Sequence, residues 1–495
     1  MAEVVPTAVD RGPRAEWLSA LVRSPWLWVG IVLLGLGARC RQYLANPSFW
    51  YDEAFLVRSV YECSFTELIG PLPSRTITPP IFLWLLRACY QEIGPQEWSL
   101  RLPAFCAGLV ALGLMFPLAR CWLGAPGWLW AVGFCALSTH AVNHSFEVRP
   151  YATDFLLTIL ILLAARIYLS DDSPRIRRRA AVGLLMAAAL APWLSFASAF
   201  VLAAASLSLF VDYWRGRERR RLAYWLGLNG LLLATSFFVW FVQARHLYYP
   251  GLKEEWTVVW GGFPRDYAPG SVLLWSLQAP ERVAHYASTG LGVPLLVLGV
   301  LGLARCWRRS SEEGLLLGGP LFLAYFAALV GKYPFADRTL FFLAPCVWLL
   351  ATEGLLTVGE CLPRARVALA VLVLGLMAPG LVSTVKFCYR VKPKMEYREA
   401  LAYVHNQRRQ DDAVWNWCTD LNAVYSEHIF PWQPAGDDPA DPDAAARIAG
   451  ARPLWVISPD NRVDEMTDPL RLLSVRQTVC RQFLGVKVLR FDPAR

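Results

Sequence analysis

Residues 144–169 read HSFEVRPYATDFLLTILILLAARIYL, a polar segment followed by an apolar run. A helix needs roughly 20 mostly apolar residues to cross a bilayer. The run 150–169 has this length, and its charged residues are Asp154 and Arg166. It is therefore predicted to form a transmembrane helix whose polar end carries the segment 144–149.

Further apolar runs of similar length occur along the chain, at 25–44, 100–121, 126–143, 179–195, 197–214, 221–243, 287–305, 314–331, 339–358 and 366–386. The composition agrees, because 56% of the residues are apolar and 18% are charged, whereas soluble chains have about 45–50% and about 25%. In a bilayer each backbone polar group must be satisfied within its own segment. The sequence therefore predicts an all-α polytopic membrane bundle of about eleven transmembrane helices.

Basic residues decide how the segment 79–93, PPIFLWLLRACYQEI, is interpreted. If this segment does not span, the basic clusters all fall on the side of the N-terminus, as the positive-inside rule requires; they lie at Arg120, Arg175 to Arg179, Arg215 to Arg221, Arg305 to Arg309, and Arg364 with Arg366. Segment 79–93 is then an interfacial or re-entrant helix in a first outer loop, 45–99. The N-terminus is expected to be cytoplasmic and not a cleavable signal. The net charge of +9 belongs to these loops and does not indicate nucleic-acid binding.

The C-terminal tail, 387–495, is polar and alternates between helical and extended patterns. The predicted helices are 397–408 and 442–449, and the second of them follows an acidic stretch at 434–443. The predicted strands are 413–418, 454–457 and a pair within 478–491. This pattern predicts a small α/β domain outside the membrane, beside a transmembrane module of residues 1–386. Two of the twelve cysteines, Cys418 and Cys480, fall in the part of the tail that carries these helices and strands. They could form a disulfide in an oxidising compartment or be two buried thiols.

The first outer loop contains two adjacent acids, Asp52 and Glu53, within FWYDEA at 49–54. An interfacial aromatic belt explains Trp50 and Tyr51, but it does not explain the carboxylates, which tend to mark function near a membrane. Alternatively, one of the acids caps a short loop helix. The residues alone leave both interpretations open.

Arginines at the same outer face are candidates for binding an anion. Arg149 either pairs with Glu147 or binds phosphate, which a guanidinium fork matches in geometry. Arg338 either pairs with Asp337 or is a second phosphate ligand. Arg101 is a third candidate, although snorkelling explains it equally well.

Three histidines, His144, His246 and His285, lie on or near outer loops. Any of them could join Glu53 or Glu147 in a metal site, but solvated or hydrogen-bonded histidines are more common in loops. The long outer loop 244–286 carries Trp256, Trp260, Asp266 and Tyr267, and loops on a rigid scaffold tend to carry specificity. This loop is expected to help select the acceptor.

The order of motifs resembles that of the glycosyltransferase family 39 type of membrane enzyme, which has the GT-C fold. The motifs are WYDEA at 50–54, TPPIFLW at 78–84, LRLPA at 100–104, EVRPYA at 147–152, and Arg338 after a Tyr-Pro turn. This group includes protein O-mannosyltransferases and the bacterial transferase that adds aminoarabinose to lipid A. Many members have His where this chain has Thr78, so no role is transferred to that position.

The resemblance implies an inverting glycosyltransferase that moves a sugar from a polyprenyl-phosphate donor to an acceptor at the outer face of a cell membrane, such as a bacterial inner membrane. Asp52 would be the general base, Glu53 would position the acceptor or support a metal, and Glu147 would be a second acid near the sugar. Arg149 and Arg338, with Arg101 as a weaker candidate, would stabilise the leaving phosphate. The acceptor is a protein, a lipid or an envelope glycan. Some members of the fold use a divalent metal and others do not, so the cofactor stays open.

Other functions remain as alternatives. A transporter or flippase for a lipid-linked or polar solute would carry its charges near the membrane midplane and often has broken helices, whereas the acids of this chain concentrate in outer loops. A non-catalytic assembly protein and an enzyme that ligates a whole lipid-linked glycan are two further possibilities.

Overall fold

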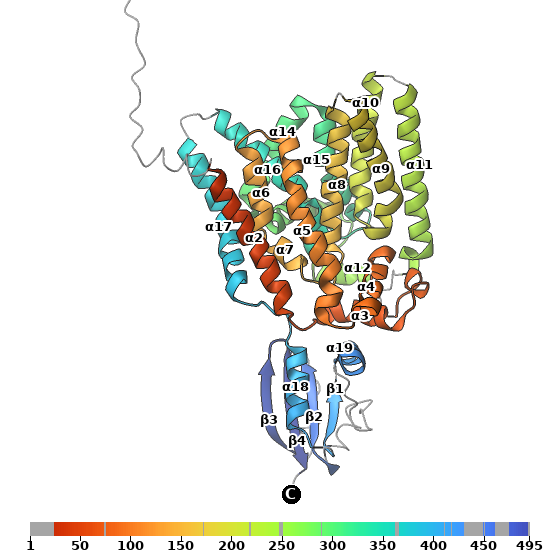
Figure 1. Ribbon diagram of the computed structural model, residues 1–495, viewed down its shortest axis with the longest axis vertical. Coiled ribbons are helices and arrows are strands. Elements are labelled where there is room, and N and C mark those ends of the chain that lie inside the picture. Colours follow the sequence, from red (N-terminus) through yellow and green to blue (C-terminus); the bar gives the residue numbers. More distant parts are fainter. Residues whose placement is uncertain are drawn as a thin grey trace, which may run out of the picture.

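The computed structural model describes residues 24–73, 76–171, 173–216, 219–246, 251–288, 290–361, 366–409, 411–416, 418–429, 449, 451–460 and 475–493. A large helical bundle carries a smaller region of helices and strands at one end, as Figure 1 shows. We call residues 397–493 the C-terminal region.

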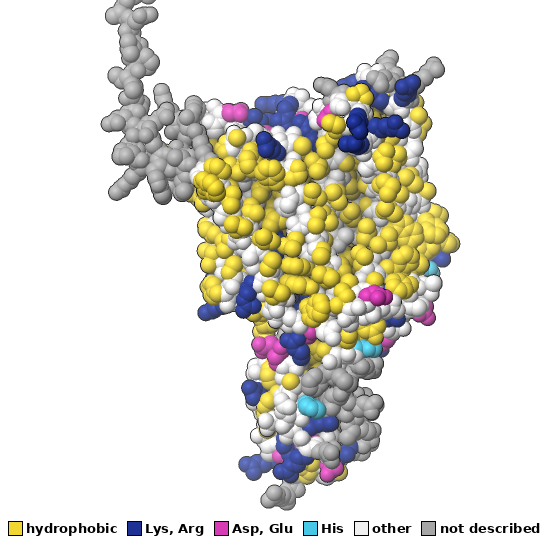
Figure 2. Space-filling view, in the orientation of Figure 1, with side chains coloured by type: hydrophobic (Ala, Val, Ile, Leu, Met, Phe, Trp, Pro, Cys, Tyr) yellow, Lys and Arg dark blue, Asp and Glu magenta, His cyan; other side chains and the backbone are white. Residues whose placement is uncertain are grey.

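The bundle contains a helix in each of the eleven apolar runs. Its helices are α2 (Pro25–Ala45), α5 (Glu97–Trp122), α6 (Gly127–Leu137), α7 (Thr139–His144), α8 (Tyr151–Ser170), α9 (Pro174–Leu194), α10 (Ser198–Gly216), α11 (Arg219–Val242), α14 (Gly292–Arg309), α15 (Ser311–Leu329), α16 (Ala344–Cys361) and α17 (Arg366–Tyr389). Apolar side chains cover the visible side of the bundle as a broad band (Figure 2). The chain is therefore a mostly helical, multi-pass membrane protein.

Fewer than eleven helices are both long enough and apolar enough to meet a strict criterion for crossing a membrane. In the described part of the chain six qualify, or seven if the bent pair formed by α13 (Pro269–Ser288) and α14 counts as one span. Among the other helices, α6 is apolar but short, α9 begins with four arginines within Arg175 to Arg179, and α2 has Arg39, Arg41 and Gln42 in its last two turns. The number eleven therefore stays a prediction.

The predicted run 126–143 is not one continuous helix, because α6 ends before Ser138 and α7 begins after it. The side chain of Ser138 caps α7 by accepting a hydrogen bond from the amide of Ala141 at 3.2 Å. The carbonyls freed at the end of α6 also have partners: Arg39 donates to Ala136 at 3.2 Å, and Thr384 donates to Leu137 at 3.2 Å. These bonds offset the cost of breaking a helix inside an apolar bundle.

Two glycines allow α14 and α16 to approach closely. A Cβ atom at Gly302 would overlap the carbonyl of Leu350, and one at Gly354 would overlap the carbonyl of Leu298. Small residues at such crossings allow the backbones of membrane helices to come into contact. This pair supports the wall of the cavity described below.

Short helices cover the end of the bundle that faces the C-terminal region (Figure 1). They include α3 (Tyr51–Glu62), α4 (Pro80–Glu92) and α12 (Leu252–Val258), with shorter turns at Glu67–Ile69, Ala244–His246 and Asp337–Leu343. The interfacial helix expected at 79–93 is α4, and its Arg87 donates to the carbonyls of Val60 and Tyr61 at 2.7 and 3.0 Å, which caps the end of α3. The prediction that 244–286 is a loop is wrong for its second half, which forms α13.

The opposite end of the bundle is basic, since lysine and arginine side chains gather at the rim farthest from the C-terminal region (Figure 2). Arg166 of α8 pairs there with Glu313 at 2.6 Å, and Arg305 of α14 pairs with Glu360 at 2.6 Å. The predicted first outer loop and the C-terminal region therefore lie at one end, and these basic residues lie at the other.

The C-terminal region contains a four-stranded sheet of order β1-β2-β4-β3. The strands are β1 (Ala413–Asn416), β2 (Leu454–Pro459), β3 (Val475–Phe483) and β4 (Val486–Pro493), joined by α18 (Tyr397–Gln407), α19 (Thr419–Val424) and a π-helical turn, Tyr425–Ile429. β1 and β2 are parallel, whereas β4 is antiparallel to both of its neighbours. The helix at 397–408 and the strands predicted in the tail are confirmed; the acidic stretch 434–443 and the helix 442–449, apart from Ala449, lie outside the described residues.

Cys418 and Cys480 are both free. Cys418 is buried, and its sulfur lies 3.0 Å from the hydroxyl of Tyr51 in α3. Burial raises the pKa of this thiol to about 12, against the opposing hydrogen bond with Tyr51. Cys480 is exposed on β3.

Candidate active site

Asp52 and Glu53 stand in the first turn of α3, at the end of the bundle that faces the C-terminal region. Side chains of successive residues on a helix point about 100° apart, so adjacent carboxylates face different surroundings. Glu53 is fully buried, whereas the side chain of Asp52 is partly exposed.

Glu53 holds the first loop together. Its carboxylate accepts two hydrogen bonds from Arg101, from Nε at 3.1 Å and from Nη2 at 2.8 Å. It also accepts from the amides of Val148 at 2.8 Å and Trp50 at 3.4 Å. Glu53 is therefore the residue that caps α3, and it joins α3 to α5 and to the turn before α8.

Arg101 does not face an open anion site, contrary to its assignment as a phosphate ligand. Its buried guanidinium donates to the carbonyls of Pro47 and Ser48 at 2.5 and 3.3 Å, in addition to Glu53. The snorkelling alternative fails as well, because a partner 48 positions away in the chain holds this side chain inside the protein.

Asp52 meets the two other predicted arginines. Arg338 donates from Nη1 to its Oδ2 atom. Arg149 lies with Nη2 3.7 Å from the same oxygen and donates to the backbone carbonyl of Asp52. The local pairs Glu147–Arg149 and Asp337–Arg338 considered above are not the observed partnerships, since arginines from two distant segments converge on Asp52.

Glu147 is buried beside this group and has partners of its own. Its Oε2 lies 2.9 Å from Nδ1 of His144, and its Oε1 lies 2.6 Å from Nζ of Lys394. Burial opposes ionisation, but His144 and Lys394 outweigh it and hold the pKa of Glu147 well below its ordinary value. Nε2 of His144 is in turn 2.6 Å from the hydroxyl of Tyr286 in α13.

Tryptophans surround the cationic groups. The guanidinium of Arg338 lies 5.8, 5.9 and 5.7 Å from the ring centroids of Trp50, Trp256 and Trp260. The ammonium of Lys394 lies 3.8 Å from the centroid of Trp50. Trp256 and Trp260 come from the segment that was expected to select the acceptor, and they reach the same group of charges.

The structure brings four of the six predicted residues together, namely Asp52, Glu147, Arg149 and Arg338, and gives the bonded pair Glu53 and Arg101 a supporting position behind them. It adds Lys394 and Tyr286, which the motifs did not indicate. A signal for Lys394 was present: Lys386, Arg390, Lys392 and Lys394 form a basic cluster at the end of the chain's last apolar run that was predicted to lie outside, where the positive-inside rule expects few basic residues.

The charges of the site do not fit a divalent metal ion. In the part of the chain that the structure describes, no group of three or more His, Cys, Asp or Glu side chains could hold one. The carboxylates of Asp52, Glu53 and Glu147 are each engaged by an arginine or a lysine. Four cationic side chains contact these three carboxylates, and such an excess of positive charge suits an anion.

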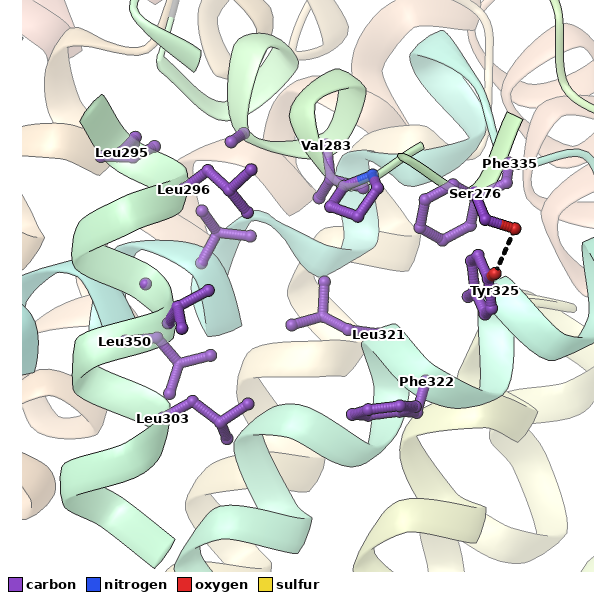
Figure 3. A pocket seen from close by; sticks show the side chains of 15 residues that line it. Ser276, Val283, Leu295, Leu296, Leu303, Leu321, Phe322, Tyr325, Phe335 and Leu350 are labelled. Atoms are coloured by element: carbon purple, nitrogen blue, oxygen red, sulfur yellow. Dashed lines mark hydrogen bonds between the residues drawn. The ribbon is translucent and has the colours of Figure 1, made fainter. Parts of the chain in front are cut away.

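An apolar cavity of about 350 Å³ lies between α13, α14, α15 and α16. Figure 3 shows leucines of α14, α15 and α16 along its walls and a hydrogen bond from Tyr325 to Ser276 at one end, 2.6 Å long, near Phe335. Two lining residues, Val300 and Phe322, are exposed on the surface of the bundle. The cavity therefore extends from the apolar surface to Phe335, three residues before Arg338.

Comparisons with known proteins relate part of the chain to a family and the whole chain to solved structures. Residues 78–240 match the family model of dolichyl-phosphate-mannose-protein mannosyltransferases. No curated protein matches the chain significantly in sequence.

Solved structures share the fold over nearly the whole chain. ArnT from Cupriavidus metallidurans in the apo state is 13% identical with a TM-score of 0.55, covering 97% of this chain and 98% of that one. Its form bound to undecaprenyl phosphate is 14% identical with the same TM-score, covering 94% and 97%. The Archaeoglobus fulgidus oligosaccharyltransferase in complex with Zn and sulfate is 14% identical with a TM-score of 0.53, covering 94% and 73%. At these identities the likeness establishes the fold, and the family match relates residues 78–240 to the dolichyl-phosphate-mannose-protein mannosyltransferases.

Proposed function

We propose that this protein transfers a sugar from a polyprenyl-phosphate donor to an acceptor, with inversion at the anomeric carbon. The observation that carries the proposal is the contact of Asp52 with Arg338 and Arg149. It combines a partly exposed carboxylate with two guanidinium groups at the edge of an apolar bundle. A base for the acceptor and a counterion for a lipid phosphate are thus in one place.

The arginines and the base are linked by charge. Without a ligand, Asp52 is the anion that Arg338 and Arg149 hold. A donor phosphate competes for the same guanidinium groups, for which its geometry is well suited. Its arrival therefore leaves Asp52 free to accept a proton from the acceptor.

The reaction is a single displacement. The acceptor hydroxyl or similar group forms a bond to the anomeric carbon while the bond from that carbon to the phosphate oxygen breaks. The proton of the acceptor moves to a carboxylate oxygen of Asp52, and the electron pair of the broken bond leaves with the polyprenyl phosphate. Arg338 and Arg149 stabilise the charge that grows on that phosphate.

The remaining acids position the reacting groups. Glu53 holds α3 through Arg101, so we assign neither residue a contact with substrate. Glu147 is ionised and held by His144 and Lys394, so it is an acceptor of hydrogen bonds beside the sugar and not a proton donor.

The apolar cavity suits the prenyl chain of the donor. Its walls are apolar, it extends to the exposed surface of α14 and α15, and it approaches Arg338 through Phe335. A lipid whose tail enters between these helices would present its phosphate to the arginines.

The arrangement also supports a topology. The basic rim opposite the active site favours a cytoplasmic N-terminus, eleven spans and an active site at the extracytoplasmic face. We divide the chain into a membrane module, residues 1–386, and an extracytoplasmic α/β domain, 387–495. Trp256 and Trp260 would contact the sugar or the acceptor, which is a protein, a lipid or an envelope glycan.

The test uses purified full-length protein with radiolabelled polyprenyl-phosphate sugars and a crude cell-envelope acceptor. The wild type should release polyprenyl phosphate and transfer label from at least one donor. Arg338→Gln should reduce this about 10²–10³-fold, the usual cost of losing one group that stabilises transition-state charge. Arg265→Gln is the control, because Arg265 is an exposed arginine before α13. Equal activity of Arg338→Gln and the wild type would overturn the role of Arg338, and no release from any donor would overturn the proposed reaction.

A further inference from the structure

Lys394 reaches the active site from the segment that joins the bundle to the C-terminal region. It lies after α17 and three residues before α18. The carbonyl of the next residue, Met395, accepts a hydrogen bond from Ser48 at 2.9 Å. Because Met395 is buried, the backbone at Lys394 is fixed against the first loop. The contact with the first loop therefore holds the backbone of Lys394 beside the site.

Lys394 is the most accessible cation of the site. Its side chain is 35% exposed, compared with 22% for Arg338 and 10% for Arg149. An ammonium group has three donors, and the ion pair with Glu147 uses one of them. At least one donor is thus left for a ligand.

Its surroundings connect Lys394 to the arginines. The ring of Trp50 lies 3.8 Å from the Lys394 ammonium and 5.8 Å from the Arg338 guanidinium. Both cations therefore border the ring of Trp50, the residue that precedes the first turn of α3. Arg338 also contacts Asp52.

We propose that Lys394 binds the phosphate of the lipid donor, together with Arg338. This inference rests on the proposed function and deepens it, since it makes a residue outside the family-type motifs part of the donor site. Lys394 pairs with Glu147 in the absence of donor, and the entering phosphate takes up the free ammonium donors. The segment before the C-terminal region thereby becomes part of donor recognition.

The experiment measures binding of undecaprenyl phosphate and of undecaprenol, which has the same chain without the phosphate, to the purified full-length protein in detergent. Lys394→Gln should weaken binding of the phosphate about tenfold to a hundredfold, as expected for one charge-assisted hydrogen bond, and leave binding of the alcohol unchanged. Lys394→Arg should recover most of the affinity. Lys392→Gln is the matched control, because Lys392 is an exposed lysine two residues away whose ammonium lies over Phe387 at 5.7 Å.

Two comparisons make each outcome decisive. If Lys394 acts only by neutralising Glu147, its loss should have no effect in the Glu147→Gln background; a persistent loss of phosphate affinity in the double variant supports direct binding. Wild-type affinity of Lys394→Gln for undecaprenyl phosphate would overturn the inference and leave the proposed function standing. Equal affinity of the wild type for the phosphate and the alcohol would overturn both.

Discussion

Asp52 and Glu53 are adjacent in the chain, but their partners give them different tasks. Glu53 is buried against Arg101 and accepts two backbone amides, so its charge is satisfied inside the protein. Asp52 is partly exposed and meets its arginines at the surface of the site. One carboxylate therefore maintains the fold, and we propose the other as the base.

Glu53→Gln should destabilise the protein. The substitution leaves the buried charge of Arg101 without a counterion, and breaking a buried ion pair costs about 3–5 kcal/mol. Thermal unfolding in detergent should show a clearly lower Tm for Glu53→Gln than for Glu254→Gln, an exposed acid of α12. An unchanged Tm would contradict the structural role of Glu53.

At the scale of helices and strands, continuous apolar runs in the sequence predicted the positions of the helices well. Each predicted run contains a helix, and α4 has its expected place at the end of the bundle. The break between α6 and α7 could not be predicted, because it depends on carbonyl partners from Arg39 and Thr384 in distant helices. Helix α13 was missed because Pro280, Glu281 and Arg282 interrupt its apolar pattern.

The cavity between α13 and α16 gives a prediction at this scale. Gly299 lines the cavity, and a Cβ atom there would meet nothing within 4 Å. Gly299→Leu should therefore fill space without a clash and displace the prenyl chain. A prenyl chain gains little free energy by moving from the bilayer into an apolar cavity, because both surroundings are apolar. We therefore expect the KM of Gly299→Leu for a long-chain donor to rise only about fivefold.

The control for this change is Gly230→Leu. Gly230 is exposed on α11 and also has nothing within 4 Å of its Cβ position. The two variants add the same side chain, one in the cavity and one on the outer surface of the bundle. Equal KM values would remove the cavity from donor binding.

For the whole molecule, the C-terminal region and the first outer loop act as one unit. A single hydrophobic cluster contains Phe49 and Leu56 of the loop and Val404 and Trp455 of the C-terminal region. Arg398 pairs with Glu97 at 2.8 Å, and the hydroxyl of Tyr425 donates to the same carboxylate at 2.9 Å. The shared core explains how a segment near the end of the chain places Lys394 beside residues of α3 and α8.

The candidate site could be predicted in part. Residue types and predicted outer location singled out Asp52, Glu53, Arg149 and Arg338, and the family resemblance implied the roles of Asp52 as base and of Glu147 beside the sugar. They did not separate Arg101 from the other arginines, since a buried partner rather than a local pattern decides its role. They also missed Lys394, because pairing across 247 positions of the chain leaves no short motif.

The central claim is that Asp52 accepts the proton of the acceptor, and single-turnover kinetics of Asp52→Asn test it most directly. With the active donor identified, the transfer rate and the donor affinity of Asp52→Asn are measured against the wild type. We predict a rate about 10²–10⁴-fold lower, with the donor bound at least as tightly, because Arg338 and Arg149 no longer have a competing carboxylate. Transfer by Asp52→Asn at the wild-type rate would contradict the account.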